Sequence, residues 1–433
     1  MAGLSAARVL SRRYSSVTVL DRDTLPDDAS PRRGVPQSAQ PHILLISGLI
    51  ELTSLFPGLD QELIAAGGVR FDPGLSLCTY RYGRRWPATE TGLDLISVTR
   101  PQLEALVRAR LTDDPAVAIR DQVAVSGLAG SDGRVTGVVL DTGETFDAAL
   151  VVDCTGRGSR SDRWLAALDL PLPGQTEIKI GVTYTSRAYR RSPGDLPGWQ
   201  AALTLPTPPH EKTMAVAVPV ENDRWLVGFG GWHLADPPTD VETFERSARA
   251  LPDPAVAEVI SRAEPLSDVV LTRFPSSRRR HFERLDKLPA GYVALGDAIC
   301  SFNPIYGQGM TCAAKEATAL GAALDAHGRE PTVAMARDYY AAAAAVIATP
   351  WQFAVGGDFV YPETTGPRPR GVAARNWYSR QIALASQIDS EISRTFTAVQ
   401  QLITPPSVLT QPRFVARVLR LARKRTREGD EVL

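Results

Sequence analysis

Two stretches of this sequence place a carboxylate and glycines directly after a short apolar run, an arrangement suited to binding a polar cofactor. In residues 150–159, Leu-Val-Val leads to Asp153 and to a turn that contains Gly156. In residues 295–310, Asp297 is followed by a Gly-Gln-Gly turn and a helix-forming segment. A carboxylate at a strand end can bind polyol hydroxyls, and free N–H groups at a helix start can bind a pyrophosphate or an electron-rich ring edge. The two stretches therefore predict two parts of one nucleotide-cofactor site.

A third pattern, near Met1, has related chemistry. Gly3 lies at the start of a predicted amphipathic helix over residues 2–14, and the strand predicted at 17–20 ends in Asp21. In a dinucleotide-binding fold, such a glycine lets the backbone approach the pyrophosphate, and such an acidic residue accepts hydrogen bonds from the ribose. Any helix followed by a strand can offer a glycine and an aspartate, so an ordinary structural role for both residues stays equally open.

The elements that must position these residues change in character along the chain. Residues 178–184, 214–220 and 225–229 alternate apolar side chains with smaller or polar ones. This pattern indicates an antiparallel sheet with one covered face and one face free to form a pocket wall. A short buried strand at 292–295 and a small-residue helix from Gly309 to about Ala326 return to the pattern of a parallel sheet.

This order of elements predicts an α/β fold with three regions. Residues 1–162 and 273–338 form the nucleotide-binding domain, residues 163–272 an inserted antiparallel sheet for the substrate, and residues 339–433 a helical C-terminal region. The glycine-rich run at 228–231 follows a strand and leads to no helix. We interpret it as a place where the sheet bends or admits a ligand, not as a second nucleotide site.

Composition narrows the class of function. The chain has 433 residues, with 48 basic and 48 acidic side chains, so no net field draws it to nucleic acid. Its four cysteines have no CxxC spacing and its five histidines do not cluster with them, so we expect no metal site. The sequence shows no signal peptide and no apolar run of about 20 residues. We expect a cytoplasmic protein with free thiols and a small-molecule partner.

The motifs resemble those of one enzyme group. Residues 296–310 resemble the Gly-Asp-Ala motif of FAD-dependent aromatic hydroxylases, squalene epoxidases and polyether epoxidases, and residues 153–159 are similar to the second nucleotide motif of that group. Arg100 matches the arginine that starts the intervening helix, and residues 33–37 and 41–45 resemble a loop of the bacterial epoxidase-like branch. The resemblance covers nearly the whole chain in the right order. It implies a Rossmann-like FAD-binding domain of the hydroxylase type.

In this group the aspartate of the Gly-Asp-Ala motif binds the ribityl chain, and the turn after it lies near the flavin ring. The motifs and the resemblance together predict cofactor contacts from Gly3, Asp21, Arg22, Arg33, Gln37, Arg100, Asp153, Gly156, Asp297, Pro304, Gly307, Gly309 and Met310.

The resemblance also implies the reaction. A flavin hydroperoxide would insert one oxygen atom into an apolar polyene, terpenoid or polyketide-type substrate, by epoxidation of an alkene or by hydroxylation, with epoxidation preferred. NADPH or NADH would act as a transient reductant, with an external flavin reductase as the alternative. No catalytic side chain is predicted, because the cofactor performs the difficult step while the protein positions the substrate and excludes water.

One departure from the group concerns the first residues. Related chains begin with a β-strand and a Gly-x-Gly-x-x-Gly turn, whereas the segment that starts at Met1 aligns with the inside of that turn. We expect a start that lies upstream or a truncated chain, and otherwise weak binding of FAD.

Alternatives and two basic segments remain open. A geranylgeranyl-reductase-like flavin reductase and a flavin-free remnant are the rival functions; a flavin halogenase is disfavoured because no Trp-x-Trp-x-x-Pro segment occurs. We interpret the arginine run at 278–280 as a solvated loop, with a contact to an NADPH phosphate as the alternative. The amphipathic tail at 414–427 could lie on a membrane, but a helix packed on its own protein is preferred.

Overall fold

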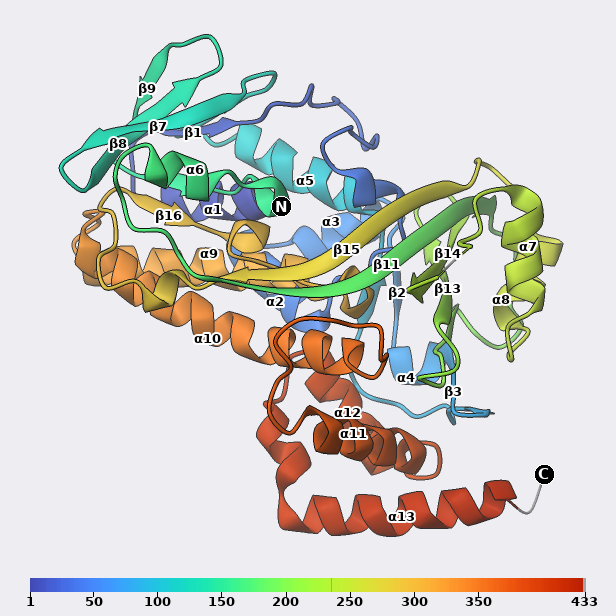
Figure 1. Ribbon diagram of the computed structural model, residues 1–433. Coiled ribbons are helices and arrows are strands. Elements are labelled where there is room, and N and C mark those ends of the chain that lie inside the picture. Colours follow the sequence, from blue (N-terminus) through green and yellow to red (C-terminus); the bar gives the residue numbers. More distant parts are fainter. Residues whose placement is uncertain (235, 431–433) are drawn as a thin grey trace.

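A long, mostly antiparallel sheet and a half with parallel strand pairs make up the body of the molecule (Figure 1); the second is the half predicted to bind a nucleotide and is called the nucleotide half below. The computed structural model describes residues 1–234 and 236–430. The strands of the large sheet, in spatial order, are β17 (Cys300–Ser301), β15 (Val270–Arg280), β11 (Gln175–Arg190), β14 (Arg224–Trp232), β13 (Thr213–Val220), β12 (Ala201–Thr204), β3 (Leu77–Arg81) and β4 (Arg84–Arg85). All neighbours are antiparallel except β12 and β3.

The predicted alternation explains how this sheet uses its two faces. In β14, Trp225 and Val227 are buried against helices α7 (Val241–Arg249) and α8 (Ala255–Arg262), whereas Leu226 and Trp232 belong to the core on the opposite face. Successive side chains of a strand point to opposite faces, so one face packs on helices and the other is left to form a wall. The sheet also includes β3, β4 and β17, which come from outside residues 163–272.

The nucleotide half contains two separate parallel pairs. β1 (Val17–Leu20) pairs with β6 (Val117–Arg120), and β10 (Val151–Asp153) pairs with β16 (Tyr292–Ala294). Within residues 1–234 and 236–430, no strand joins β1 to β10. Helices bridge the two pairs instead.

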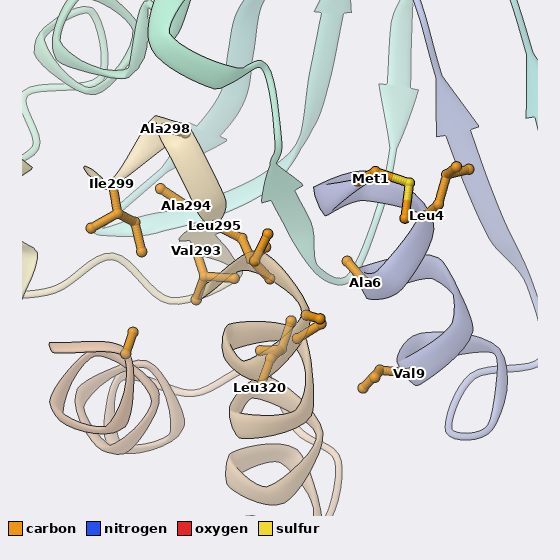
Figure 2. Packing of buried hydrophobic residues seen from close by; sticks show 14 of the residues in the cluster. Met1, Leu4, Ala6, Val9, Val293, Ala294, Leu295, Ala298, Ile299 and Leu320 are labelled. Carbon is orange, nitrogen blue, oxygen red and sulfur yellow. The ribbon is translucent and has the colours of Figure 1, made fainter. Parts of the chain in front are cut away.

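Helix α1 (Ala2–Ser11) contacts β1, β10 and helix α9 (Gly309–Ala326). Figure 2 shows Ala6 and Val9 of α1 on the side of Leu295, after β16, and of Leu320 in α9, with Leu4 on the far side of α1. All of these side chains are buried, so apolar packing of α1 and α9 joins the two halves of the parallel region.

The remaining elements complete this half. They are α2 (Ile46–Leu55), α3 (Leu59–Ala65), α4 (Pro73–Ser76), α5 (Arg100–Thr112), α6 (Ser161–Ala166), the β2 (Val69–Phe71) and β5 (Leu95–Ser97) pair, and the β7 (Val125–Ser131), β8 (Arg134–Leu140) and β9 (Thr145–Asp147) sheet.

The C-terminal region is helical, as predicted. α10 (Val333–Asp358) packs on α9, and α11 (Val372–Ser386), α12 (Ser390–Gln400) and α13 (Pro412–Asp430) form a cluster of their own (Figure 1). Val418 and Ala422 of α13 are fully buried in that cluster. The tail therefore packs on its own protein, which confirms the preferred interpretation. Among the described residues, no helix is both long enough and apolar enough to cross a membrane. The α/β fold, with its inserted antiparallel sheet and helical C-terminal region, is confirmed.

Candidate cofactor and substrate site

One large cavity runs between the nucleotide half and the open face of the large sheet. Its volume is about 1360 Å³, and its wall includes the ends of β1 and β10, the turn at 304–310 and the inner face of β13 and β14. Pockets for one drug-sized ligand have volumes of roughly 300–1,000 Å³. The cavity therefore has room for a dinucleotide cofactor and for a second molecule.

The two predicted turns meet at this cavity. β10 and β16 pair in register, with Asp153 opposite Ala294, and the Leu295 N–H donates to the Asp153 carbonyl at 2.9 Å. Both turns line the cavity. The hypothesis that they converge in space around one cleft is therefore confirmed.

A buried arginine bridges the same turns. Arg280 is 2 % exposed; its Nη1 donates to the Ala298 carbonyl at 2.8 Å and its Nη2 to the Ser159 carbonyl at 3.1 Å. The interpretation of residues 278–280 as a solvated loop is therefore wrong. The run is the end of strand β15, and Arg280 holds the two turns together from behind.

Asp297 lies at the start of helix α9 and lines the cavity. A Cβ added to Gly309 would lie 3.7 Å from Asp297 Oδ1, so this carboxylate is beside the helix N-terminus. Burial raises the pKa of Asp297, whereas the charges of Arg100 and Arg157 lower it. The turn itself is held by Glu316, whose Oε2 accepts a hydrogen bond from the Gly296 N–H at 2.6 Å. Burial raises the pKa of Glu316 to about 8.

The turn at 304–310, which follows in the chain, leads to backbone N–H groups that face the cavity. Gly307 has φ +66°, a left-handed conformation that glycine adopts at little cost, and α9 begins two residues later. The first N–H groups of an α-helix have no partner within the helix. Gln308, Gly309 and Met310 all line the cavity at this point, so donors are available there for an electron-rich group.

A buried polar network fixes this turn from the other side. Asn303 Nδ2 donates to Asp358 Oδ1 at 2.7 Å, and Asn303 Oδ1 accepts from the Tyr184 hydroxyl at 2.7 Å. Trp232 Nε1 also donates to Asp358 Oδ1, at 2.8 Å, while Asp358 Oδ2 has no hydrogen-bond partner among the residues that the structure describes. Burial raises the pKa of Asp358 to about 7 against the effect of these hydrogen bonds. The network ties the turn to the large sheet and to α10.

The glycines at 228–231 let the surrounding loops approach the sheet. A Cβ added to Gly228 would lie 2.7 Å from Pro41 Cγ, and one added to Gly230 would lie 3.2 Å from Ile305 Cδ1. Both glycines line the cavity. The run therefore admits the turn at 304–310 close to the sheet, which agrees with its interpretation as a point of close approach.

At the other end of the cavity, one arginine organises three carboxylates. Arg32 donates to Asp21 at 3.0 Å, to Asp23 at 2.9 Å and to Glu104 at 2.8 Å. The neighbouring Arg33 is exposed and does not line the cavity. The structure thus places Arg32, not the predicted Arg33, at the cavity wall, because adjacent side chains of this segment point in different directions.

The Asp153 carboxylate accepts hydrogen bonds mainly from residues of its own turn. Its Oδ1 accepts from the Thr155 N–H at 2.9 Å and hydroxyl at 2.6 Å, and its Oδ2 accepts from the Ser159 hydroxyl at 2.6 Å and from Tyr292 at 3.2 Å. Its carboxylate therefore shapes the turn, and its prediction as a cofactor contact now depends on the backbone around Gly156, which has φ +74° and open space beside it.

Arg100 has the opposite character. It lines the cavity, and within the described part of the chain its Nε is buried without a hydrogen-bond partner. Burial lowers the pKa of Arg100, against the nearby carboxylates of Glu104 and Asp297. A buried guanidinium without a hydrogen-bonded anion is unfavourable by itself. Together with Asp297 and the free N–H groups of α9, it fits the polar chain of FAD.

The predicted contacts fall into two groups. Those that line the cavity are Gly3, Asp21, Arg22, Gln37, Arg100, Asp153, Gly156, Asp297, Pro304, Gly307, Gly309 and Met310, and Arg33 lies outside it.

Sequence reasoning missed His42 as a cavity residue. Its Nδ1 lies 2.8 Å from the Gln40 carbonyl, which can only accept, so Nδ1 carries the proton and Nε2 is free to accept a hydrogen bond. Burial and the charge of Arg100 lower its pKa to about 4, so the ring is neutral at physiological pH. The sequence feature that could have indicated His42 is its position in the loop at 41–45, which resembles a loop of the epoxidase-like branch.

Comparisons with known proteins agree with this geometry. A family model described as an FAD binding domain matches residues 83–353. Protein Rv3254 of Mycobacterium tuberculosis is 32% identical over 450 residues, which cover 99% of this chain and 94% of the relative.

Two solved structures show the same fold. A probable FAD-dependent monooxygenase, pqsL of Pseudomonas aeruginosa, has a TM-score of 0.60 at 19% identity, covering 83% of this chain and 94% of that one. A flavoprotein/dehydrogenase from Cytophaga hutchinsonii has a TM-score of 0.68 at 14% identity, covering 99% and 97%. The chain belongs to the family defined by this FAD-binding domain.

Proposed function

We propose that the protein is an FAD-dependent monooxygenase that inserts one oxygen atom into a largely apolar substrate, by epoxidation or hydroxylation. The observation that carries the proposal is the single cavity that joins the cofactor turns to the inner face of the large sheet. Reduced FAD supplies the activation of molecular oxygen. The chain supplies binding, orientation and exclusion of water.

In this proposal Asp297 binds hydroxyls of the cofactor's polyol chain, and Arg100 binds its anionic part. The N–H groups at the start of α9 donate hydrogen bonds to the electron-rich edge of the flavin ring, next to the turn that Asn303 and Asp358 hold. The positive end of α9 stabilises negative charge at that edge.

The substrate lies between the turn and the sheet. Tyr184, Met214, Val216 and Trp232 contribute an apolar and aromatic wall, and His42 offers a neutral acceptor for a substrate hydroxyl. NADPH or NADH is the proposed reductant.

The test is a turnover assay with isotopically labelled dioxygen. The full chain is reconstituted with FAD and incubated with NADPH and a panel of polyene and aromatic compounds. The proposal requires substrate-dependent consumption of NADPH and oxygen, with one labelled oxygen atom in the product. A reduced product without label would instead identify a flavin-dependent reductase on the same fold.

A further inference from the structure

The cavity continues beyond the flavin-side turn to a second end, between the β3–β4 hairpin and the helices α10 to α12. This end is lined by Arg81, Tyr82, Trp86, Phe353, Arg380 and Phe396. Figure 1 shows these helices packed below the large sheet, on the side of β3. The lining is mostly aromatic, with two guanidinium groups among the rings.

The two guanidinium groups lie around one aromatic ring and have no carboxylate. Cζ of Arg81 is 4.8 Å from the centroid of the Tyr82 ring, and Cζ of Arg380 is 5.5 Å from the same centroid. Among the described residues neither arginine forms an ion pair, and the Nε atom of Arg81 is buried without a hydrogen-bond partner. By contrast, Arg85 on the same hairpin pairs with Asp253 at 2.6 Å. Arg380 is exposed and half-buried Arg81 has the unsatisfied Nε, so an anionic ligand would gain most from Arg81.

The Trp86 indole adds a second unsatisfied donor to this end of the cavity. Its Nε1 is buried and finds no hydrogen-bond partner within residues 1–234 and 236–430. Buried indole N–H groups usually find an acceptor. An acceptor-rich ligand would satisfy this donor together with Arg81.

The backbone that carries Arg81 and Tyr82 is held in place by the C-terminal region. Gln387 Nε2 donates to the Arg81 carbonyl at 2.6 Å, and Arg425 donates both to Gln387 Oε1, at 2.6 Å, and to the Tyr82 carbonyl, at 3.4 Å. Tyr82 itself has φ +50°, a left-handed conformation that a tyrosine rarely adopts. A hairpin turn with two positive φ values favours Asn or Gly at this position, so turn geometry alone does not account for the tyrosine.

We propose that this end of the cavity binds the carboxylate of an elongated, otherwise apolar substrate. Arg81 and Arg380 bind the carboxylate, and Tyr82, Trp86 and Phe396 contact the apolar body that extends toward the flavin. A planar guanidinium matches a carboxylate in charge and shape. The inference deepens the proposed monooxygenase function, and it makes the substrate class an aromatic or polyene acid.

The test uses two probes of equal shape and different charge. Binding of 2-naphthoate and 2-naphthamide to the FAD-loaded full chain is measured by isothermal titration calorimetry at neutral pH. We expect the naphthoate to bind about 10-fold more tightly, as for a hydrogen bond to a charged group. Arg81→Gln and, separately, Arg380→Gln are expected to lower naphthoate affinity about 10-fold and to leave naphthamide affinity unchanged.

Arg84→Gln is the matched control, because Arg84 is exposed on the same hairpin and lies outside the cavity. Equal affinity for the two probes in the wild type, or an equal loss in Arg84→Gln, would overturn the proposal. The flavin absorbance of the same samples reports FAD content separately. Loss of flavin would count against the monooxygenase function, whereas charge selection by Arg81 and Arg380 would still be measured.

Discussion

The two sheet regions of this molecule are held together in different ways. In the large sheet, backbone hydrogen bonds connect eight strands without a break, from β17 to β4. In the nucleotide half, β1–β6 and β10–β16 are separate pairs, and packing of α1 and α9 joins them. Regions with few backbone bridges open at lower free energy than a continuous ladder. The comparison teaches that the cofactor must contribute to the stability of the half that binds it.

Arginine side chains provide further links within the nucleotide half, where the two strand pairs share no backbone hydrogen bonds in the described part of the chain. Arg32 links Asp21 and Asp23, after β1, to Glu104 on α5, and Arg280 joins the turns after β10 and β16. The Nε of Arg100, in contrast, has no hydrogen-bond partner in the described part of the chain. We infer that the first two arginines serve the fold and the third serves the ligand.

The largest effect that would sharpen this comparison is expected from Arg100→Gln. The affinity of this variant for FAD should be about 10- to 100-fold lower than that of the wild type, since a charge-assisted hydrogen bond contributes about 1.5–3 kcal/mol. The free energy of unfolding without FAD should not fall, because the cost of burying this charge outweighs its attraction to Glu104 and Asp297. Arg110→Gln is the control for FAD titration, because Arg110 lies in the last turns of the same helix, outside the cavity, and pairs with Glu62. Equal losses in both variants would contradict a cofactor role for Arg100.

The second effect concerns amide hydrogen exchange in the two regions. In the FAD-free chain, β1 and β10 should exchange faster than β13 and β14. FAD at 100 times its Kd contributes about 2.7 kcal/mol, so exchange in β1 and β10 should slow by up to about 100-fold. Mass spectrometry of peptides from both regions measures the difference. If FAD slowed exchange equally in both sheets, the inference that the cofactor mainly stabilises the nucleotide half would be wrong.

Arg32→Gln tests the ionic link of the nucleotide half. It leaves three partly buried carboxylates without their common cation, which should lower the free energy of unfolding by about 2 kcal/mol. Arg33→Gln is the neighbouring control and should change stability by less than about 0.5 kcal/mol. Urea unfolding compares the two variants. A larger loss from Arg33→Gln would show that the wrong arginine has been assigned.

Asp358→Asn tests the contact between the sheet and the flavin-side turn. The folded-state pKa of Asp358 is raised to about 7, so the folded chain binds more protons than the unfolded chain between about pH 4 and pH 7. The carboxyl group therefore destabilises the fold increasingly as pH rises through that window. At pH 8 the Asn variant should be about 1–2 kcal/mol more stable than the wild type, and the difference should vanish below about pH 4.

Asp358→Leu provides the contrast, because it leaves the donors of Trp232 and Asn303 unpaired. This variant should be less stable than the wild type at every pH. If the Asn variant were also destabilised at pH 8, the carboxyl group would be ionised and satisfied in the fold, contrary to our account.

Local patterns predicted the parts of this site that are close together in sequence. Asp297, Gly307 and Gly309 belong to one strand–turn–helix segment, whose spacing alone places the carboxylate near the helix start. The fold class followed from the same kind of signal, because alternation in β13 and β14 and the small-residue helix α9 each have a clear period.

The rest depends on contacts between distant segments. Arg280 meets Ser159 across 121 positions and Asn303 meets Asp358 across 55, and no local pattern marks either partner. Arg32 and Arg33 are adjacent in an irregular loop, where no periodicity indicates which side chain points inward. The sequence also does not distinguish Arg81 from Arg85 and Arg425, because the partners of the last two, Asp253 and Gln387, lie far away along the chain.

The most direct test of the central claim is the FAD content of the full chain after incubation with the cofactor and gel filtration. Our account predicts a single FAD per chain for the wild type and for Arg110→Gln, and strongly reduced flavin in Arg100→Gln and Asp297→Ala. A well-folded wild-type chain that retains no flavin, or an Asp297→Ala variant that retains it fully, would contradict the assignment of this cavity to FAD.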